Sequence, residues 1–206
     1  MNRASLCLLL ALMAAFPLSL LAGRVWIDPA ATPNAAVILM ELRLPRGLLA
    51  LVIGAGLGAS GAAMQGYLRN PLADPGLFGI APGAALGAVL CLWLGFASGY
   101  LLPIFALAGA AGAMALLALI AGRSGGIALF TLAGMMIASL AGALTALVIS
   151  LAPNAFATIE IVTWLMGALT DRSWNDVWLA APLTLAGIAV LMRTGKALDA
   201  LTLGEA

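Results

Sequence analysis

The chain has 206 residues, of which 64% are hydrophobic and only 8% charged, and its formal net charge is +1. Soluble domains are about 25% charged, so a soluble globule could not hide this much apolar surface. The small net charge indicates neither a nucleic-acid-binding nor a polybasic lipid-binding surface, and the lack of histidine removes the commonest metal ligand and the usual general base.

Long uncharged runs place the chain among polytopic helical membrane proteins. Residues 47–68, 75–122 and 124–159 contain no Asp, Glu, Lys or Arg, and one bilayer crossing needs only about 20 apolar residues. Cys7 and Cys91 lie in apolar stretches without CxxC spacing, so we interpret them as packing residues. We predict an all-α fold, in which about six transmembrane helices form a single domain over residues 1–206.

Charges, turns and Pro/Gly clusters divide the apolar sequence into six candidate spans. In chain order they cover residues 4–22, 46–68, 77–97, 101–121, 127–151 and 177–192. The first resembles a secretory signal, but its apolar core is longer than the roughly 7–15 residues of a cleaved signal, and we interpret it as a retained span. The sixth is short, and we expect Trp174 and Trp178 beside it to lie in the membrane interface.

Between the fifth and sixth spans, residues 159–169 are too few to cross a membrane and too apolar for an ordinary loop. Two interpretations stay open: a re-entrant or interfacial helix, and an amphipathic surface helix. A cytoplasmic N-terminus is weakly favoured, because it places one more basic residue inside than outside. The inside set is then Arg3, Arg69, Arg123, Arg193 and Lys196, and the outside set is Arg24, Arg43, Arg46 and Arg172.

Glycines recur at four-residue spacing in the second and third spans, at Gly54 and Gly58 and at Gly79, Gly83 and Gly87. Such stripes let helix backbones approach closely, so we predict that they mediate helix packing. Away from their ends the spans hold no Asp, Glu, Lys or Arg, which disfavours an ion-coupled transporter because such a transporter usually needs an ionisable group at membrane depth. The segment "RTGKAL" lacks the upstream glycine and the following Ser/Thr of a phosphate-binding loop. Energy for any uphill transport must therefore come from a partner.

The sequence "QGYLRNPLADPG", residues 65–76, interrupts two apolar runs with polar residues. Pro71 and Pro75 exclude helix at the residues before them, which predicts an irregular connection. We expect Asp74 to cap the N-terminus of the third span. We also expect Arg69 and Asn70 to donate to carbonyls left open where the second span ends, near Gln65. On these grounds the passage is a capped turn without a catalytic role.

Residues 42–90 closely resemble the signature region of the FecCD-type permeases of binding-protein-dependent ABC importers, which take up ferric siderophores, haem or cobalamin. The matching pieces are "RLPR" (43–46), "QG..RNPLADP" (65–75) and "G...GAALGAV" (79–89). Further along, "WLMGAL" (164–169) and "ALDALTLGEA" (197–206) resemble later parts of the same family.

This resemblance implies a permease subunit in the bacterial inner membrane, with a cytoplasmic N-terminus and without enzymatic activity or a cofactor of its own. Its partners would be a second permease subunit, alike or different, cytoplasmic ATPase subunits, and a periplasmic or lipid-anchored substrate-binding protein. Residues 193–206 would begin the cytoplasmic region that couples the permease to the ATPase. The candidate contacts there are Leu198, Leu201, Leu203, Gly204 and Glu205. The turn residues Gln65, Arg69, Asn70, Pro71, Asp74 and Pro75 would shape the inner mouth.

The resemblance implies a fold of typically about ten helices, whereas this sequence ends after six spans, inside the coupling region. We therefore interpret it as the N-terminal part of a permease, or as one of two chains that share the fold. The alternative function is a non-transporting membrane scaffold or an inactive permease fragment.

Overall fold

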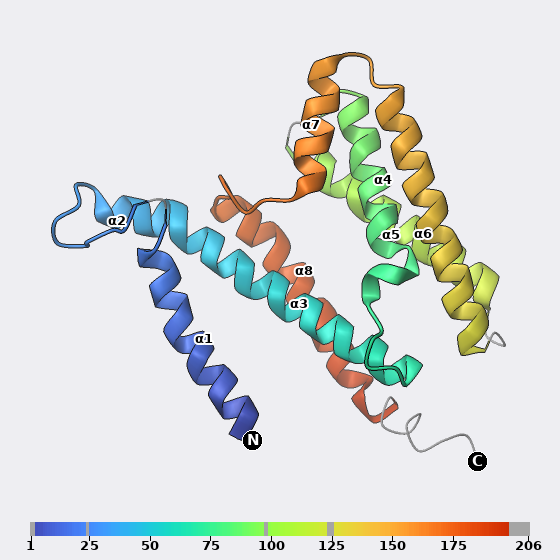
Figure 1. Ribbon diagram of the computed structural model, residues 1–206, viewed down its shortest axis with the longest axis horizontal. Helices are drawn as coiled ribbons and strands as arrows, with labels where there is room; N and C mark the ends of the chain where they lie inside the picture. The colour runs from blue at the N-terminus through green and yellow to red at the C-terminus, as the bar shows by residue number, and fades with distance from the viewer. Residues whose placement is uncertain (1–2, 24, 97–98, 123–125, 198–206) are drawn as a thin grey trace. The chain divides into compact units, whose positions relative to one another are not determined.

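The computed structural model describes residues 3–23, 25–96, 99–122 and 126–197, and the regular structure in these ranges is entirely helical (Figure 1). The elements are α1 (Arg3–Leu21), α2 (Ala35–Val37), the π-helix η1 (Ile38–Arg43), α3 (Leu44–Leu68), the 3-10 helix η2 (Pro75–Phe78), α4 (Ile80–Trp93), α5 (Leu101–Ala121), α6 (Ile127–Ser150), α7 (Ala155–Met166) and α8 (Trp174–Arg193). The predicted all-α fold is confirmed.

Within the described ranges, five helices are long and apolar enough to cross a membrane. They are α1, the continuous run Ala35–Leu68, α5, α6 and α8. Helices α1, α5, α6 and α8 match predicted spans to within a few residues at both ends. The long run ends at Leu68 as predicted, but it begins at Ala35, eleven residues before the predicted start at residue 46. Because α8 begins at Trp174, this tryptophan belongs to the span itself. The short apolar stretch before α8 forms the 12-residue helix α7.

The predicted third span, residues 77–97, is wrong in length. Its helix α4 has only 14 residues and is about 21 Å long, less than the roughly 30 Å of a bilayer core. Pro75 starts a separate 3-10 turn, and Gly79 then takes a left-handed conformation with φ 79°. At the other end the backbone turns at Gly95, with φ 78°. Backbone breaks at two glycines therefore shorten a segment that is uniformly apolar.

The chain forms two compact units, which we describe separately. The first contains residues 1–59 and 169–195, and the second contains residues 60–168 and 196–206. The first unit holds α1, the long helix up to Ala59, and α8 (Figure 1). The second holds the end of α3, the turn that follows it, and α4 to α7.

In the first unit, a proline leaves one carbonyl oxygen of the π-helix without a backbone donor. Leu44 closes η1 by donating its N–H to the carbonyl oxygen of Leu39, five residues earlier. Pro45 is the next residue and has no N–H, so it cannot donate to the carbonyl oxygen of Met40. The indole nitrogen of Trp174 donates to that oxygen instead, at 3.1 Å. A side chain of α8 thus satisfies an acceptor that the helix itself leaves open.

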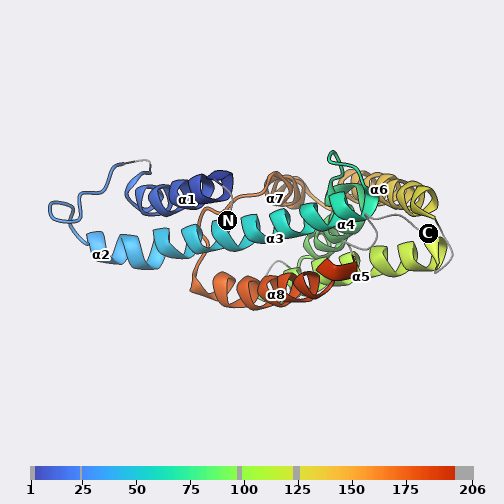
Figure 2. The same cartoon turned by 90° about the horizontal axis from the view of Figure 1, so that it is seen from below.

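In the second unit, α4 and α5 pack side by side at a close crossing (Figures 1 and 2). A Cβ atom at Gly83 would lie 2.6 Å from the Cβ of Ala113 and 2.8 Å from the carbonyl oxygen of Gly109. One at Gly87 would collide with the carbonyl oxygen of Phe105. The two backbones are therefore in direct contact, which only glycine permits here.

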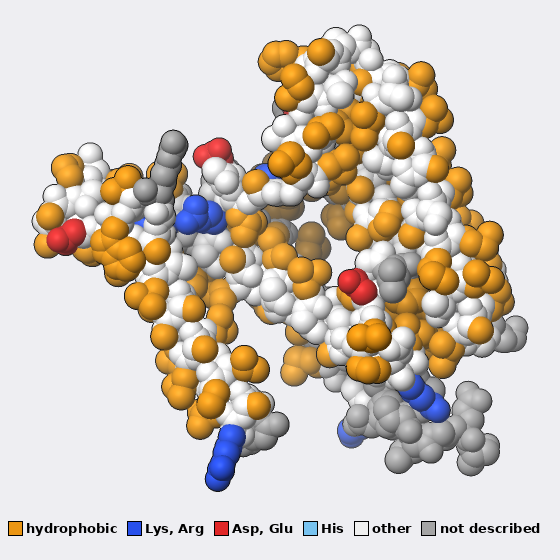
Figure 3. Space-filling model, in the orientation of Figure 1, with side chains coloured by type: hydrophobic (Ala, Val, Ile, Leu, Met, Phe, Trp, Pro, Cys, Tyr) orange, Lys and Arg blue, Asp and Glu red, His pale blue; other side chains and the backbone are white. Residues whose placement is uncertain are grey.

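Two small apolar clusters form the core of this unit. The first consists of Phe78, Ala113, Leu117, Ala121, Ala133 and Ile137, and the second of Val89, Leu92 and Ile161. Ile161 is fully buried, so α7 packs against α4 through this side chain. Elsewhere most large apolar side chains are exposed, and hydrophobic side chains cover the visible helix surfaces while charged ones are sparse (Figure 3). This distribution suits helices surrounded by lipid.

Candidate functional site

The polar turn, residues 65–76, begins with a well-formed helix C-terminus. The N–H of Asn70 donates to the carbonyl oxygen of Gln65 at 3.2 Å, and the N–H of Arg69 donates to that of Gly66 at 3.3 Å. This pair of bonds is a Schellman motif, whose left-handed position is usually glycine. Here Arg69 occupies it, with φ 51°. Arg69 and Asn70 thus donate to open carbonyls at the end of α3 as predicted, through their backbone N–H groups.

The side chain of Asn70 has a different role, because its Oδ1 accepts the N–H of Leu72 at 2.9 Å. The carbonyl oxygen of Asn70 in turn accepts the N–H of Ala73 at 3.1 Å. Pro71 lies inside this tight turn, where a fixed φ is an advantage and an N–H is not required. The side chain of Asn70 therefore organises the residues that follow it, while its backbone N–H closes the helix before it.

Asp74 is a helix cap, but of a different helix from the one predicted. Its Oδ1 accepts the N–H of Gly76 at 2.6 Å, with Pro75 as the first residue of η2. The N-cap of α4 itself is Gly79, which provides no side chain. Asp74 and Pro75 thus fix a one-turn helix between the polar turn and α4.

That one-turn helix ends in a buried anchor. Phe78 is only 1% exposed, its ring lies 5.2 Å from that of Phe130, and Tyr67 meets Phe130 edge-on at 5.3 Å. Gly134 leaves the space, since a Cβ there would lie 3.0 Å from the Cα of Phe78. Gly79 is equally constrained, because a Cβ there would lie 2.6 Å from Ile137 Cγ2. The polar turn is therefore held against α6, because the side chain of Phe78 packs into the space beside Gly134.

The predicted glycine stripe of the second span has no neighbour in this structure. Apart from the adjoining residues and backbone of α3 itself, no heavy atom of the described residues lies within 4 Å of a Cβ built at Gly54 or Gly58. Gly56, on another face of α3, does have a close neighbour, because a Cβ built there would lie 2.8 Å from Thr184 Cγ2. A packing role for Gly54 and Gly58 stays a prediction. The partner glycines Gly109 and Gly134 were missed, although Gly109 and Ala113 show the small-residue spacing of four that marks packing helices.

Arg43 fastens the end of α1 to the long helix in the first unit. Its guanidinium donates to the carbonyl oxygens of Leu20 at 2.8 Å, Leu21 at 2.7 Å and Val25 at 2.9 Å. A cation at the C-terminal carbonyls of a helix is favourable on electrostatic grounds as well. The first arginine of "RLPR" therefore has a structural role, because it joins the end of α1 to the long helix.

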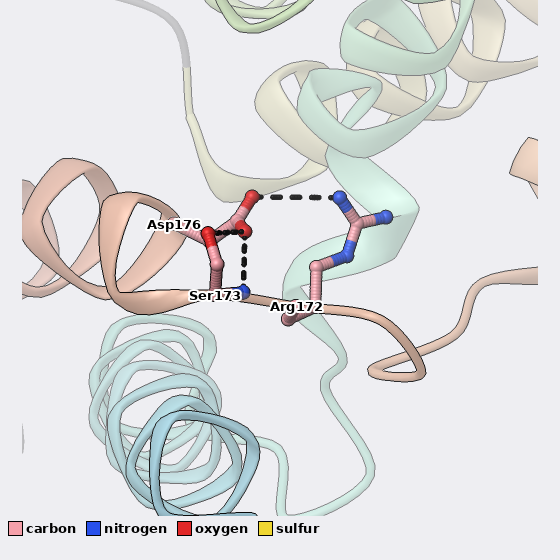
Figure 4. A network of polar contacts seen from close by, with 3 residues as sticks. All are labelled: Arg172, Ser173 and Asp176. Carbon is pink, nitrogen blue, oxygen red and sulfur yellow. Dashed lines mark hydrogen bonds and ion pairs between the residues drawn. The ribbon is translucent and has the colours of Figure 1, made fainter. Parts of the chain in front are cut away.

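A second polar network starts α8 (Figure 4). The carboxylate of Asp176 accepts the N–H of Ser173 at 2.8 Å and its hydroxyl at 3.1 Å, and Arg172 lies 3.5 Å away. The Asp176 carboxylate reaches back to the N-cap N–H as in a capping box. The exposed ion pair adds little stability of its own.

The five candidate ATPase contacts, from Leu198 to Glu205, lie outside the described residues, and so does Arg123. Among the residues that are described, no three His, Cys, Asp or Glu side chains cluster in a way that could hold a metal ion. The features that the described residues do show are capped turns, close helix crossings and apolar surface.

The sequence matches the model of the FecCD transport family over residues 9–206. The chain belongs to the FecCD transport family. This confirms the family resemblance of the motifs in residues 42–90 and 164–206.

Curated relatives in the FecCD family include permeases named for cobalamin. The chain is 34% identical to the vitamin B12 import system permease protein BtuC of Escherichia coli (strain K12 / DH10B), over 97% of this chain and 62% of the relative. It is 37% identical to the cobalamin import system permease protein BtuC of Halobacterium salinarum, over 84% and 47%. It is 38% identical to the uncharacterized ABC transporter permease protein YvrB of Bacillus subtilis, over 84% and 50%.

A solved structure shares the fold. It is described as an inward-facing conformation of a metal-chelate type ABC transporter, and it matches with a TM-score of 0.87 and 32% identity, over 96% of this chain and 64% of that one. The chain therefore spans between about half and two thirds of the length of these relatives.

Proposed function

We propose that the chain is a permease subunit of an ATP-driven importer that moves an iron–siderophore complex, haem or cobalamin across the bacterial inner membrane. The observation that carries this proposal is the FecCD family match over residues 9–206, supported by the 0.87 TM-score to a metal-chelate type transporter. Two relatives are named for vitamin B12 or cobalamin, so the cargo classes to test first are a corrinoid and a ferric chelate.

The energy source would be a separate ATPase. The apolar spans lack ionisable side chains along their central parts, so a proton or ion relay has no groups to use. In this proposal a second permease subunit completes the pathway and a substrate-binding protein delivers the cargo from outside. Residues 193–206 meet the ATPase on the cytoplasmic side, with Leu198, Leu201, Leu203, Gly204 and Glu205 as the contacts.

With the N-terminus in the cytoplasm, the polar turn would lie at the inner mouth. The hydrogen bonds made by the side chains of Asn70 and Asp74 run within the turn, its backbone N–H groups bond to the end of α3, and Phe78 packs against α6. Gln65, Arg69, Asn70, Pro71, Asp74 and Pro75 would therefore shape and stiffen this mouth rather than recognise the cargo.

Affinity capture tests the assembly. The tagged chain is co-expressed with the ATPase and binding protein encoded near its gene, solubilised from membranes and recovered. We expect the ATPase to co-purify, with a full-length permease of the same family as the positive control. Failure to recover it while the control succeeds would contradict the proposal. Recovery without uptake of labelled cobalamin or ferric chelate in cells that express all components would instead support the non-transporting scaffold.

A further inference from the structure

The long helix α3 takes part in both compact units of the chain. It runs without interruption from Leu44 to Leu68 (Figure 1), but the boundary between the units falls inside it, between residues 59 and 60. The chain crosses between the units twice more, at residues 168–169 and 195–196, outside the helices α1 to α8. Because the two parts of one helix move together unless it bends, the residues near this boundary control any movement between the units.

On the side of the first unit, α3 is fixed by two neighbouring helices. Leu49 is only 3% exposed. A Cβ atom at Gly47 would lie 3.0 Å from the ring of Phe16 in α1, and one at Gly56 would lie 2.8 Å from Cγ2 of Thr184 in α8. The part of α3 that ends at Gly56 is therefore packed into the first unit.

On the side of the second unit, the last two turns of α3 are fixed as well. Met64 and Leu68 pack against the buried cluster that contains Phe78. The ring of Tyr67 meets that of Phe130 in α6 edge-on at 5.3 Å. This end of α3 therefore belongs with α6 and the polar turn.

Between these two fixed parts lies the segment "LGASGAA", residues 57–63. The structure describes all seven residues, and none of them is buried. Apart from the adjoining residues and backbone of α3, no heavy atom of the described residues lies within 4 Å of a Cβ built at Gly58 or Gly61. Glycine is a poor helix former, and sharp helix bends occur at pairs of Gly and Ser, which Ser60 and Gly61 form. The least supported part of α3 thus coincides with the boundary between the units.

We propose that residues 57–63 are a hinge at which α3 bends, so that the two units move as separate bodies. Hinges of this kind are formed by a few residues, often small ones, that absorb the change in backbone angles. The first body would hold α1, α8 and α3 up to Gly56, and the second would hold the end of α3, the polar turn and α4 to α7. The inference concerns the chain itself and depends neither on the cargo nor on the ATPase proposed above.

Double electron–electron resonance on the chain in lipid nanodiscs measures the movement. Met192→Cys in α8 and Leu119→Cys in α5 carry one spin label in each unit, since these side chains are 78% and 81% exposed. Cys7→Ala and Cys91→Ala first remove the native thiols. The resulting chain is the parent for all variants, and we expect it to give a broad distribution of distances between the labels.

Replacing both hinge glycines should restrict the bending. In Gly58→Ala/Gly61→Ala we expect the distance distribution to narrow to roughly half its width, because alanine fits at both positions and favours a straight helix. Gly54→Ala is the matched control, since it lies in the same helix with equally open surroundings but outside residues 57–63. It should leave the width unchanged. Conversely, Ala62→Gly adds a glycine to the hinge and should broaden the distribution.

Three outcomes would overturn the proposal. A single narrow distribution in the parent chain would show that the two units form one rigid body. An unchanged width in Gly58→Ala/Gly61→Ala would place the movement elsewhere. Equal narrowing in Gly54→Ala would mean that these glycines act through the stability of the whole helix. Labels at Leu119→Cys and Met136→Cys, both in the second unit, control for movement within a unit, and far-UV circular dichroism checks that each variant keeps its helices.

Discussion

The indole Nε1 of Trp174 donates a hydrogen bond to the carbonyl oxygen of Met40 at 3.1 Å, across 134 residues of sequence. The bond exists because Pro45, five residues after Met40, has no N–H to offer. The same proline therefore leaves an acceptor open in the long helix, and Trp174 of α8 fills it.

Replacing Trp174 by Phe should lower the free energy of unfolding by about 1 kcal/mol, because one backbone acceptor loses its partner. In a Pro45→Ala background, residue 45 regains an N–H, and the same substitution should cost less. A double-mutant cycle in mild detergent, with unfolding followed by circular dichroism, measures this coupling. Trp178→Phe is the control, since Trp178 is 71% exposed. Equal costs of Trp174→Phe in both backgrounds would show that the bond is incidental.

The crossing of α4 and α5 should be intolerant of a single methyl group. Gly87→Ala places a Cβ against the carbonyl oxygen of Phe105, which is backbone and cannot move aside. We expect a destabilisation of about 1–3 kcal/mol, the usual cost of overpacking. Gly112→Ala on α5 is the matched control, because nothing lies within 4 Å of a Cβ there. It should be neutral or slightly stabilising, since alanine is the better helix former. Similar melting temperatures for the two variants would refute the close crossing.

Substitutions of Arg69 test whether its left-handed backbone conformation limits the stability of the polar turn. Arg69→Gly and Arg69→Ala both remove the guanidinium, but only glycine adopts φ 51° without steric cost. The glycine variant should therefore unfold at higher denaturant concentration than the alanine variant, by about 1 kcal/mol in free energy. If alanine matches or exceeds glycine, the left-handed conformation is not what limits this turn.

The sequence predicts the positions of the helices well because long apolar, uncharged runs mark them, as the match of α5 to residues 101–121 shows. It predicts helix ends less well where the backbone conformation of single residues sets them. The shortness of α4 depends on positive φ at Gly79 and Gly95, which a uniformly apolar window does not reveal. The second span was predicted to begin at residue 46, yet the helix extends back through Pro45, and the carbonyl oxygen that this proline leaves open accepts a hydrogen bond from Trp174, far away in sequence.

In the polar turn, the residue types indicated that helix ends are capped, but they did not indicate which groups each capping residue bonds. Asp74 was expected to cap a long span, and it caps a single turn because only the four residues Pro75–Phe78 lie between Asp74 and the left-handed Gly79. The role of Phe78 could not be found at all, since it depends on a hole at Gly134 in another helix. A local sequence pattern does not predict contacts between segments that are distant in the sequence.

Asp74→Ala should impair assembly more than it changes substrate choice. The substitution removes the acceptor of the 2.6 Å bond from the N–H of Gly76, at a cost of about 1 kcal/mol, and it loosens the turn that carries Phe78 into the core. In the complete importer we expect less permease in the membrane fraction, with an unchanged ratio of cobalamin to ferric-siderophore uptake per molecule of permease. Asp74→Asn keeps an acceptor and should restore most of the abundance. Normal abundance of Asp74→Ala with an altered uptake ratio would instead place Asp74 on the cargo pathway.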